Sequence, residues 1–361
     1  IYEDPTQPLN ARLDDLISQM TLDEKTVQMA TLYGYKRVLK DSLPTKEWKN
    51  LIWKDGIANI DEMLNGFIQW NYELNKLDIV TDIPKHVWAM NEVQRFFIEQ
   101  TRLGIPVDFT NEGIRGIEAY EATGFPTQLN MGMTWNRNLV KQMGQITGKE
   151  ARALGYTNVY APILDVARDQ RWGRLEEVYG EDPYLTAELG IEMTKGIQEH
   201  TAATAKHFAV YSANKGAREG MARTDPHLAP REVIDLLLYP FQRVIKEANL
   251  MGVMSSYNDY DGVPVSGSSY WLIDVLRKWF GFTGYVVSDS DALEYLYSKH
   301  ATAANLKEAV YQAFMAGMNV RTTFNMPDSI IIYLRQLVNE NRIPMDTINS
   351  RVRDVLSVKC R

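Results

Sequence analysis

An aspartate at the end of a short apolar run is the first candidate for chemistry. The residues GYVVS at positions 284–288 predict a buried strand, because Val and Tyr favour strands that are covered on both faces. Asp289 follows directly, and helical spacing resumes at residues 292–296. In parallel α/β folds, catalytic groups gather at the carboxyl ends of strands. Asp289 is therefore either a catalytic carboxylate or, like Asp291, a cap of the next helix, and this stretch alone leaves both open.

Polar or ionisable residues also follow four other predicted strands. Carboxylates, Lys and Arg bind sugar hydroxyls through charge-assisted hydrogen bonds, so a ring of them around one mouth suits a polyhydroxylated substrate. The 19 Tyr, 8 Trp and 11 Phe residues suit stacking on sugar rings and a large core equally well. The residues at the five strand ends are Asn111, Glu112, Asp165, Arg168, Asp169, Arg171, Arg174, Lys206, His207, Tyr257, Asn258 and Asp289.

Strand-like and helix-like segments alternate along most of the chain. Because no linker or compositional break interrupts the 361 residues, the pattern predicts one α/β domain over residues 1–361, a (β/α)8 TIM-barrel-like fold. Six strands are clear and two are not, so the N-terminal part is expected to be irregular. The expected strands lie at 104–109, 158–164, 202–208, 251–256, 284–288 and 319–323. The expected helices lie at 86–101, 138–154, 183–199, 230–248, 269–279, 303–316 and 327–340.

Both ends of the chain are expected to be helical. Residues 1–35 form a helical lead-in, with an amphipathic helix over residues 9–17. A capping box at Thr21 and Glu24 predicts a second helix that ends at about Leu32. Residues 340–361 are expected to contain the last helix of the barrel.

Composition and motifs exclude several other functions. A formal net charge of −7 argues against nucleic-acid and anionic-membrane partners, and no apolar run is long enough to span a membrane. One cysteine, Cys360, and histidines without HxxxH spacing predict no metal site and no disulfide framework. No GxSxG, GxGxxG or P-loop motif occurs, so we expect neither a serine hydrolase nor a nucleotide-binding enzyme, and no cofactor.

Several short segments resemble glycoside hydrolase family 3, in the order in which that family carries them. The resemblance spans residues 10–361 and implies a (β/α)8-like first domain. It also implies retaining hydrolysis of β-linked sugars from the non-reducing end. The segments are RLGIP (102–106), YAPILD (160–165), RWGR (171–174), KHF (206–208) and GFTGYVVSD (281–289).

The same resemblance assigns roles to individual residues. Asp289 matches the nucleophile of the family. Arg174 is expected to be structural and to pair with Glu176, Glu177 or Glu181. The positions that hold the terminal sugar or flank the nucleophile are matched by Glu112, Arg171, Lys206, His207 and Tyr257.

Two departures from the family pattern concern the sugar. Many glucosidases of the family carry Asp where Glu112 stands and Trp where Ser290 stands. In that comparison the Asp holds the hydroxymethyl side of the sugar, and the longer Glu would fill this space. We therefore expect a β-xylosidase, with a β-glucosidase as the alternative.

The second carboxyl group that retaining hydrolysis requires is not evident. In most of the family an acid/base Glu lies in a following α/β sandwich domain, and we expect that domain to be absent from this chain. Single-domain members use an Asp-x-His dyad, which Asp225 and His227 match, and this alternative predicts a β-N-acetylglucosaminidase. A helix-entry turn before Pro230 explains the same two residues and is favoured.

A barrel that binds sugar without cleaving it is the alternative from another class. Such a protein would keep Lys206, His207 and Glu112 but could lose the carboxylate at position 289, which is present here. The chain starts at Ile1 rather than Met, and the family usually acts outside the cytoplasm. A periplasmic or secreted location is therefore expected.

Overall fold

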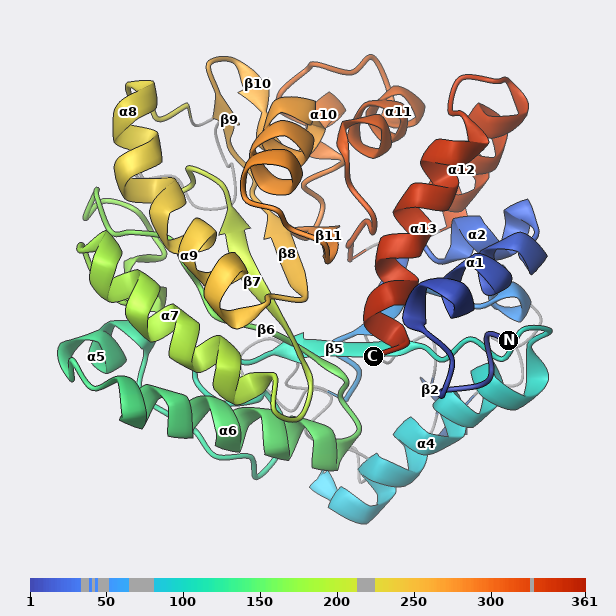
Figure 1. Cartoon of the computed structure of the whole chain (residues 1–361), viewed down its shortest axis with the longest axis horizontal. Helices are drawn as coiled ribbons and strands as arrows, with labels where there is room; N and C mark the ends of the chain where they lie inside the picture. Colours follow the sequence, from blue (N-terminus) through green and yellow to red (C-terminus); the bar gives the residue numbers. More distant parts are fainter. Residues whose placement is uncertain (34–38, 41–42, 45–51, 65–80, 213–224, 325–327) are drawn as a thin grey trace.

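The computed structural model describes the chain apart from residues 34–38, 41–42, 45–51, 65–80, 213–224 and 325–327. Its main sheet is parallel and runs in the order β1-β4-β5-β6-β7-β8-β11. Figure 1 shows these strands at the centre of the molecule, with helices around them. The strands are β1 (Thr31–Tyr33), β4 (Asn59–Asp61), β5 (Asp108–Glu112), β6 (Asn158–Tyr160), β7 (Ala202–Phe208), β8 (Gly252–Ser255) and β11 (Tyr285–Ser288). Two antiparallel pairs lie apart from them: β2 (Leu39–Lys40) with β3 (Leu43–Pro44), and β9 (Asp259–Tyr260) with β10 (Val263–Pro264).

A short segment between β11 and β1 closes the sheet into a barrel. Val320 forms a parallel bridge to Val287 of β11, and Arg321 forms one to Ala30, next to β1. The carbonyl of Arg321 also accepts a hydrogen bond from the N–H of Thr31 at 3.1 Å. Among the described residues, eight parallel segments therefore surround one core, which confirms the predicted TIM-barrel-like fold.

Helices cover the outside of the barrel, as (β/α) repeats require. In Figure 1, α7 lies between α6 and α9, and it packs on both. Two of these helices begin at capping side chains, because Asn136 and Asp182 accept hydrogen bonds from the first-turn N–H groups of α6 and α7. The helices are α1 (Leu9–Gln19), α2 (Leu22–Val27), η2 (Ile52–Asp55), α4 (Ile83–Gln100), α5 (Gln128–Met133), α6 (Arg137–Leu154), η4 (Leu175–Glu177), α7 (Pro183–Ile197), α8 (Pro230–Glu232), η5 (Val233–Leu238), α9 (Tyr239–Ala248), η6 (Val265–Gly267), η7 (Tyr270–Trp279), α10 (Tyr295–Ser298), α11 (Leu306–Ala316), α12 (Asp328–Asn339) and α13 (Met345–Lys359).

The N-terminal part differs from the prediction. α2 begins with the expected capping box, in which Thr21 and Glu24 bond each other's backbone N–H, but it ends at Val27. The expected helix to about Leu32 is wrong beyond that point, because residues 31–33 form β1. β1 and β4 are the two strands of the main sheet that the sequence analysis missed. Each has three residues, too few for periodicity to show, and pairing with neighbouring strands decides their conformation.

A small apolar cluster fills the interior of the barrel. It brings together side chains from β6, β8 and β11, and β6 is not adjacent to either of the others in the sheet. Such residues can meet only inside a closed barrel, so the interior is a packed core rather than a channel. Its members are Ala58, Tyr160, Met254, Tyr285, Val287, Val320 and Val355.

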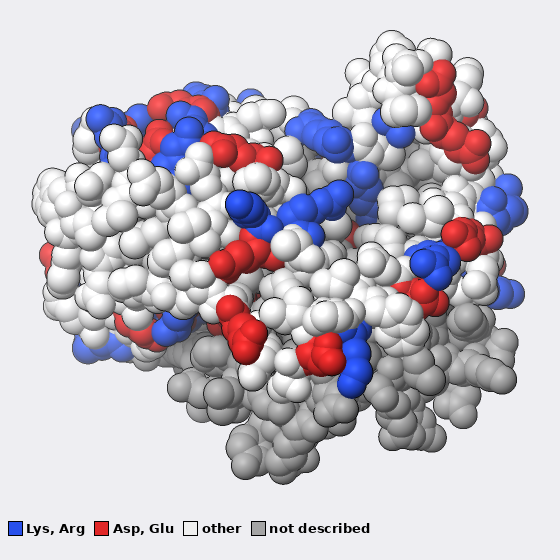
Figure 2. All heavy atoms as spheres, turned by 90° about the horizontal axis from the view of Figure 1, so that it is seen from below, with Lys and Arg blue, Asp and Glu red and all other residues white. Residues whose placement is uncertain are grey.

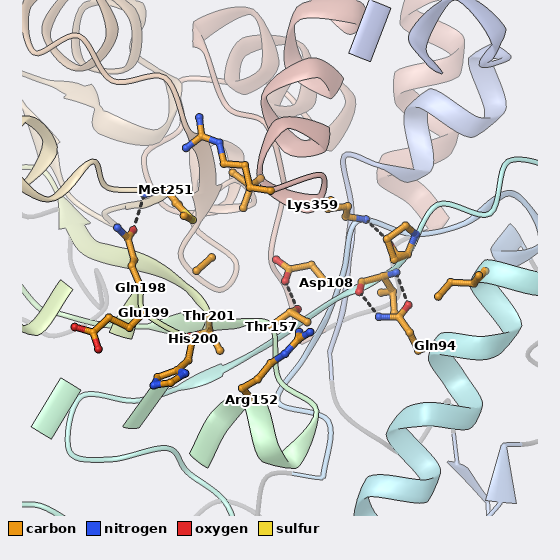
Figure 3. A pocket seen from close by; sticks show the side chains of 16 residues that line it. Gln94, Asp108, Arg152, Thr157, Gln198, Glu199, His200, Thr201, Met251 and Lys359 are labelled. Atoms are coloured by element: carbon orange, nitrogen blue, oxygen red, sulfur yellow. Dashed lines mark hydrogen bonds between the residues drawn. The ribbon is translucent and has the colours of Figure 1, made fainter. Parts of the chain in front are cut away.

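A cavity of about 500 Å³ lies at the amino ends of the strands (Figure 3). Its lining includes Asp108, the first residue of β5, and Lys359, the last residue of α13. The ammonium of Lys359 donates hydrogen bonds to Oε1 of Gln28 at 2.8 Å and to the carbonyls of Pro106 at 2.9 Å and Ile57 at 3.1 Å. These bonds tie the C-terminal helix to three other segments of the barrel.

Replacing Lys359 with Met should lower the free energy of unfolding by about 2 kcal/mol, because three oxygen acceptors lose their shared donor. Urea unfolding followed by circular dichroism measures this change. Lys278→Met is the matched control, since that side chain is 71% exposed and pairs with Asp274 of the same helix. The control should stay within about 0.5 kcal/mol of the parent. Equal losses in both variants would contradict the role given to Lys359.

The surface in Figure 2 shows charges of both signs. Lys and Arg side chains lie among Asp and Glu on this face, and wide areas between them carry other residues. In the part of the chain that the structure describes, no helix is both long and apolar enough to cross a membrane.

Candidate active site

Asp289 lies at the carboxyl end of the barrel, one residue beyond β11. Its side chain is only 12% exposed. The Tyr257 hydroxyl and the backbone N–H of Ser290 each donate a hydrogen bond to Oδ1 at 2.8 Å. The N–H of Asp289 itself donates to the Ser255 carbonyl at 3.1 Å, which continues the pairing of β11 with β8. The sheet register and these two donors fix the carboxylate in one orientation.

Two nitrogen-bearing side chains face the other oxygen of Asp289. Nη1 of Arg174 lies 3.7 Å from Oδ2, and Nε2 of His207 lies 3.5 Å from it. Burial raises the pKa of Asp289 above its usual range. The charges of Arg174 and Lys206 and the hydrogen bond from the Tyr257 hydroxyl oppose that rise. Above its raised pKa, Asp289 is therefore an ionised carboxylate that is largely shielded from water.

His207 is held by a second carboxylate. Nδ1 of its ring lies 2.8 Å from Oδ2 of Asp165, and its backbone N–H donates to the same oxygen at 3.1 Å. Both side chains are buried, with 0% and 2% exposure. Burial raises the pKa of Asp165 to about 7. The sequence analysis placed Asp165 at a strand end but did not recognise it as the partner of His207.

Lys206 of β7 and Glu112 of β5 form an ion pair at the mouth, across the intervening strand β6. The ammonium lies 2.6 Å from both oxygens of Glu112. Lys206 is 3% exposed and Glu112 is 24% exposed, so the pair is open to solvent on the Glu112 side.

The buried Asp61 accepts a hydrogen bond from the Thr110 hydroxyl at 2.7 Å. Burial raises the pKa of Asp61, and its negatively charged neighbours add to the rise.

The two arginines of the RWGR segment differ in burial, and Arg171, which is expected to hold the sugar, is the exposed one. Arg171 is 72% exposed and pairs with Asp169 at 2.8 Å. Trp172 is 2% exposed and anchors the turn, and Arg174 is buried two residues later. Arg174 bonds both oxygens of Glu177 at 2.9 and 2.8 Å, as expected, but it also reaches the nucleophile candidate. The sequence alone does not indicate which of the two arginines is buried.

Asp225 and His227 have the geometry of a turn. Oδ1 of Asp225 accepts from the backbone N–H of His227 at 3.0 Å, and Oδ2 accepts from that of Gly262 at 2.9 Å. His227 is 69% exposed, and its Nδ1 lies 3.5 Å from the carboxylate. The described part of this loop therefore favours the helix-entry turn over an acid/base dyad.

The arrangement suits covalent catalysis by a carboxylate. A nucleophile must be ionised, oriented and largely desolvated, and Asp289 meets these conditions. Cations from two other segments, Arg174 and Lys206, favour its negative charge. His207 and Lys206 also present N–H donors beside it, which could bind the hydroxyls of a substrate.

Arg174→Gln should raise the pKa of Asp289 by about one unit or more, because an opposite charge near the carboxylate is lost. The carboxylate then protonates at a higher pH. A pH titration of the Asp289 carboxyl carbon by NMR measures the change. The paired control is Arg171→Gln, which removes an exposed arginine three residues earlier and should leave this pKa unchanged. Equal shifts in both variants would show that Arg174 has no special place in the site.

The family model described as the glycosyl hydrolase family 3 N terminal domain matches residues 21–358. A β-xylosidase of Formosa agariphila is 34% identical to this chain over 72% of it and is matched over 38% of its own length. A periplasmic β-glucosidase of Salmonella typhimurium is 30% identical over 97% of this chain and 42% of its own length.

Solved structures agree with these relatives. A β-glucosidase from Erythrobacter marinus, 28% identical, superposes with a TM-score of 0.87 over 100% of this chain and 46% of its own. A β-glucosidase from Listeria innocua in complex with glucose, also 28% identical, superposes with a TM-score of 0.80 over 97% of this chain and 46% of its own. The chain thus spans less than half the length of each of these relatives.

Proposed function

Because this chain belongs to glycosyl hydrolase family 3, as its motifs predict, we propose that it is the nucleophile-bearing barrel of a retaining β-glycosidase. The enzyme releases a terminal sugar from the non-reducing end of its substrate. The observation that carries this proposal is the buried Asp289 at the barrel mouth, held by Tyr257 and flanked by Arg174 and His207. A barrel that only bound sugar would need no desolvated, oriented carboxylate of this kind.

In the proposed reaction, a carboxylate oxygen of Asp289 attacks the anomeric carbon of the terminal sugar. The bond to the leaving oxygen breaks, and that oxygen takes a proton from a general acid. Water then attacks the glycosyl ester, loses a proton to the conjugate base and restores the Asp289 carboxylate. Arg174 and Lys206 stabilise that carboxylate in both steps, and Lys206 and His207 donate hydrogen bonds to sugar hydroxyls.

We propose that the general acid comes from a region of the enzyme outside this chain. That region would correspond to the part of the longer relatives that this chain does not match. Three carboxylates near Asp289 already serve as counter-ions or hydrogen-bond acceptors within the described residues. Asp225 is also occupied by two backbone N–H groups, which does not favour the dyad or a β-N-acetylglucosaminidase. The three engaged carboxylates are Glu112 with Lys206, Asp165 with His207, and Glu177 with Arg174.

A dinitrophenyl β-xyloside tests the nucleophile separately from the acid. Dinitrophenolate is stable as an anion, so it leaves without being protonated. Attack by Asp289 is therefore sufficient for this step, and no general acid is required. We expect release of dinitrophenol and an increase of the intact protein mass by one pentosyl group. The ester should persist, because no general base activates the water that would hydrolyse it. Asp289→Asn should abolish both signals, and Asp291→Asn, two residues on, should keep them. A pentosyl group on another residue, or none in the parent chain, would contradict the proposal.

Xylose is the proposed terminal sugar, with glucose as the alternative. Glu112 is 24% exposed at the mouth and bonded to Lys206, so its longer side chain lies beside the proposed sugar pocket and leaves less room than Asp would. The Formosa agariphila relative carries the name β-xylosidase, which agrees with this proposal.

Glu112→Asp should shift the ratio of xyloside to glucoside reaction toward the glucoside by about 10-fold or more, because shortening the side chain by one methylene makes room for a hydroxymethyl group. The ratio of dinitrophenol release from the two glycosides measures the shift. Glu121→Asp, an exposed carboxylate in the loop after β5, is the matched control and should leave the ratio unchanged. An unchanged ratio in Glu112→Asp would remove the argument for xylose.

A location outside the cytoplasm is proposed as well. The Salmonella typhimurium relative is named as a periplasmic protein. A hydrolase that acts on β-linked glycosides from polysaccharides would find these substrates outside the cytoplasm.

A further inference from the structure

The imidazole of His207 stands between two buried carboxylates. Oδ2 of Asp165 lies 2.8 Å from Nδ1, and Oδ2 of Asp289 lies 3.5 Å from Nε2. The ring edge of Tyr211 packs against the imidazole, with centroids 5.3 Å apart and planes at 74°. His207 is 0% exposed, so water competes little for either nitrogen. The ring is thus held on one side by Asp165 and presents its other nitrogen to the nucleophile.

The same oxygen of Asp165 fixes both the ring and the backbone of His207. Oδ2 accepts from the backbone N–H at 3.1 Å as well as lying against Nδ1. At pH values above the raised pKa of Asp165, its ionised carboxylate can only accept, so the hydrogen on this side belongs to the imidazole. Nδ1 therefore carries the proton, and Nε2 is left to face Asp289, either as an acceptor or, in the imidazolium, as a second donor.

Charge balance around the ring favours the imidazolium. Asp165 and Asp289 lie against the ring, while Glu112 pairs with Lys206 and Glu177 with Arg174, so the charges of this network are negative in excess when both aspartates are ionised. Uncompensated negative charge is costly in a buried site, and a proton on the imidazole relieves it. The facing groups are Glu112 of β5, Asp165 after β6, Arg174 and Glu177 of the following turn, Lys206 of β7, Tyr257 after β8 and Asp289 after β11.

We propose that Asp165 is a positioning residue for the reaction, which fixes His207 with Nδ1–H toward itself and Nε2 toward Asp289 and the sugar. The held imidazole then offers a proton on Nε2 to Asp289 or to a sugar hydroxyl. The binding of a sugar hydroxyl by Nε2–H rests on the proposed function, but the orientation of the imidazole ring does not. An Asn at position 165 could still accept from Nδ1–H, but it would carry no charge to stabilise the imidazolium.

The tautomer of His207 tests the proposal without any change to Asp165. Long-range proton–nitrogen NMR spectra of the sugar-free, histidine-labelled chain distinguish Nδ1–H, Nε2–H and imidazolium forms. Comparison with His207→Gln identifies its signals among the five histidines. We expect Nδ1 to carry a proton above about pH 7, where Asp165 is an ionised acceptor. A neutral ring protonated only on Nε2 would overturn the proposal.

Asp165→Asn then tests the charge of the positioning residue. The pKa of His207 should fall by one unit or more, and the affinity for D-xylose, measured by calorimetry, should fall about 10-fold. Asp108→Asn is the matched control, because Asp108 is a buried carboxylate at the amino ends of the strands. It should leave the His207 titration and D-xylose binding as in the parent.

These measurements separate the inference from the proposed function. An unchanged His207 pKa in Asp165→Asn, or an equal fall in Asp108→Asn, would overturn the role of Asp165. If the parent chain shows the expected tautomer but binds neither D-xylose nor D-glucose, the proposed function fails and the orientation of His207 stands. If Asp165→Asn does not fold, the tautomer of the parent chain alone decides the question.

Discussion

The carboxylate of Asp289 is buried at the end of a barrel strand, and a buried negative charge needs compensating groups within a few ångström. The polar groups of the mouth follow from this requirement. Positively charged or hydrogen-bonding groups surround the carboxylate, and three of them, Arg174, Lys206 and His207, are each held by an acid. The resulting pairs are Arg174–Glu177, Lys206–Glu112 and His207–Asp165. Because these partners hold the donors in place before a substrate arrives, little reorganisation is needed when charge changes on Asp289.

The barrel makes this network possible by bringing distant residues to one end. Glu112, Lys206 and Asp289 are far apart in the sequence, but each lies at or just beyond the carboxyl end of a strand. Closure depends on segment 319–323, which joins β11 to β1. At the opposite end, Lys359 ties α13 to the barrel. The catalytic groups and the contacts of Lys359 thus occupy different ends of the barrel, as is usual for barrels of this type.

Much of this arrangement could be predicted from the sequence because strand ends are visible in it. Asp289 was identified because it is a polar residue directly after a buried apolar run. The KHF and YAPILD segments identified the ends of two further strands in the same way. The short strands β1 and β4 could not be found this way, because their conformation depends on pairing with neighbours. The burial of individual side chains was equally hidden: Arg174 is buried and Arg171 is exposed, although both belong to the same short segment. The bond between Asp165 and His207 likewise appears only once two adjacent strands are aligned.

The most direct test of the account is a crystal structure of this chain after reaction with a fluorinated xylosyl donor, which slows hydrolysis of the ester. The account predicts continuous electron density between an oxygen of Asp289 and the anomeric carbon, with Lys206 and His207 beside the sugar hydroxyls. A sugar joined to any other residue, or one bound away from Asp289 without a covalent bond, would contradict the assignment of Asp289 as the nucleophile.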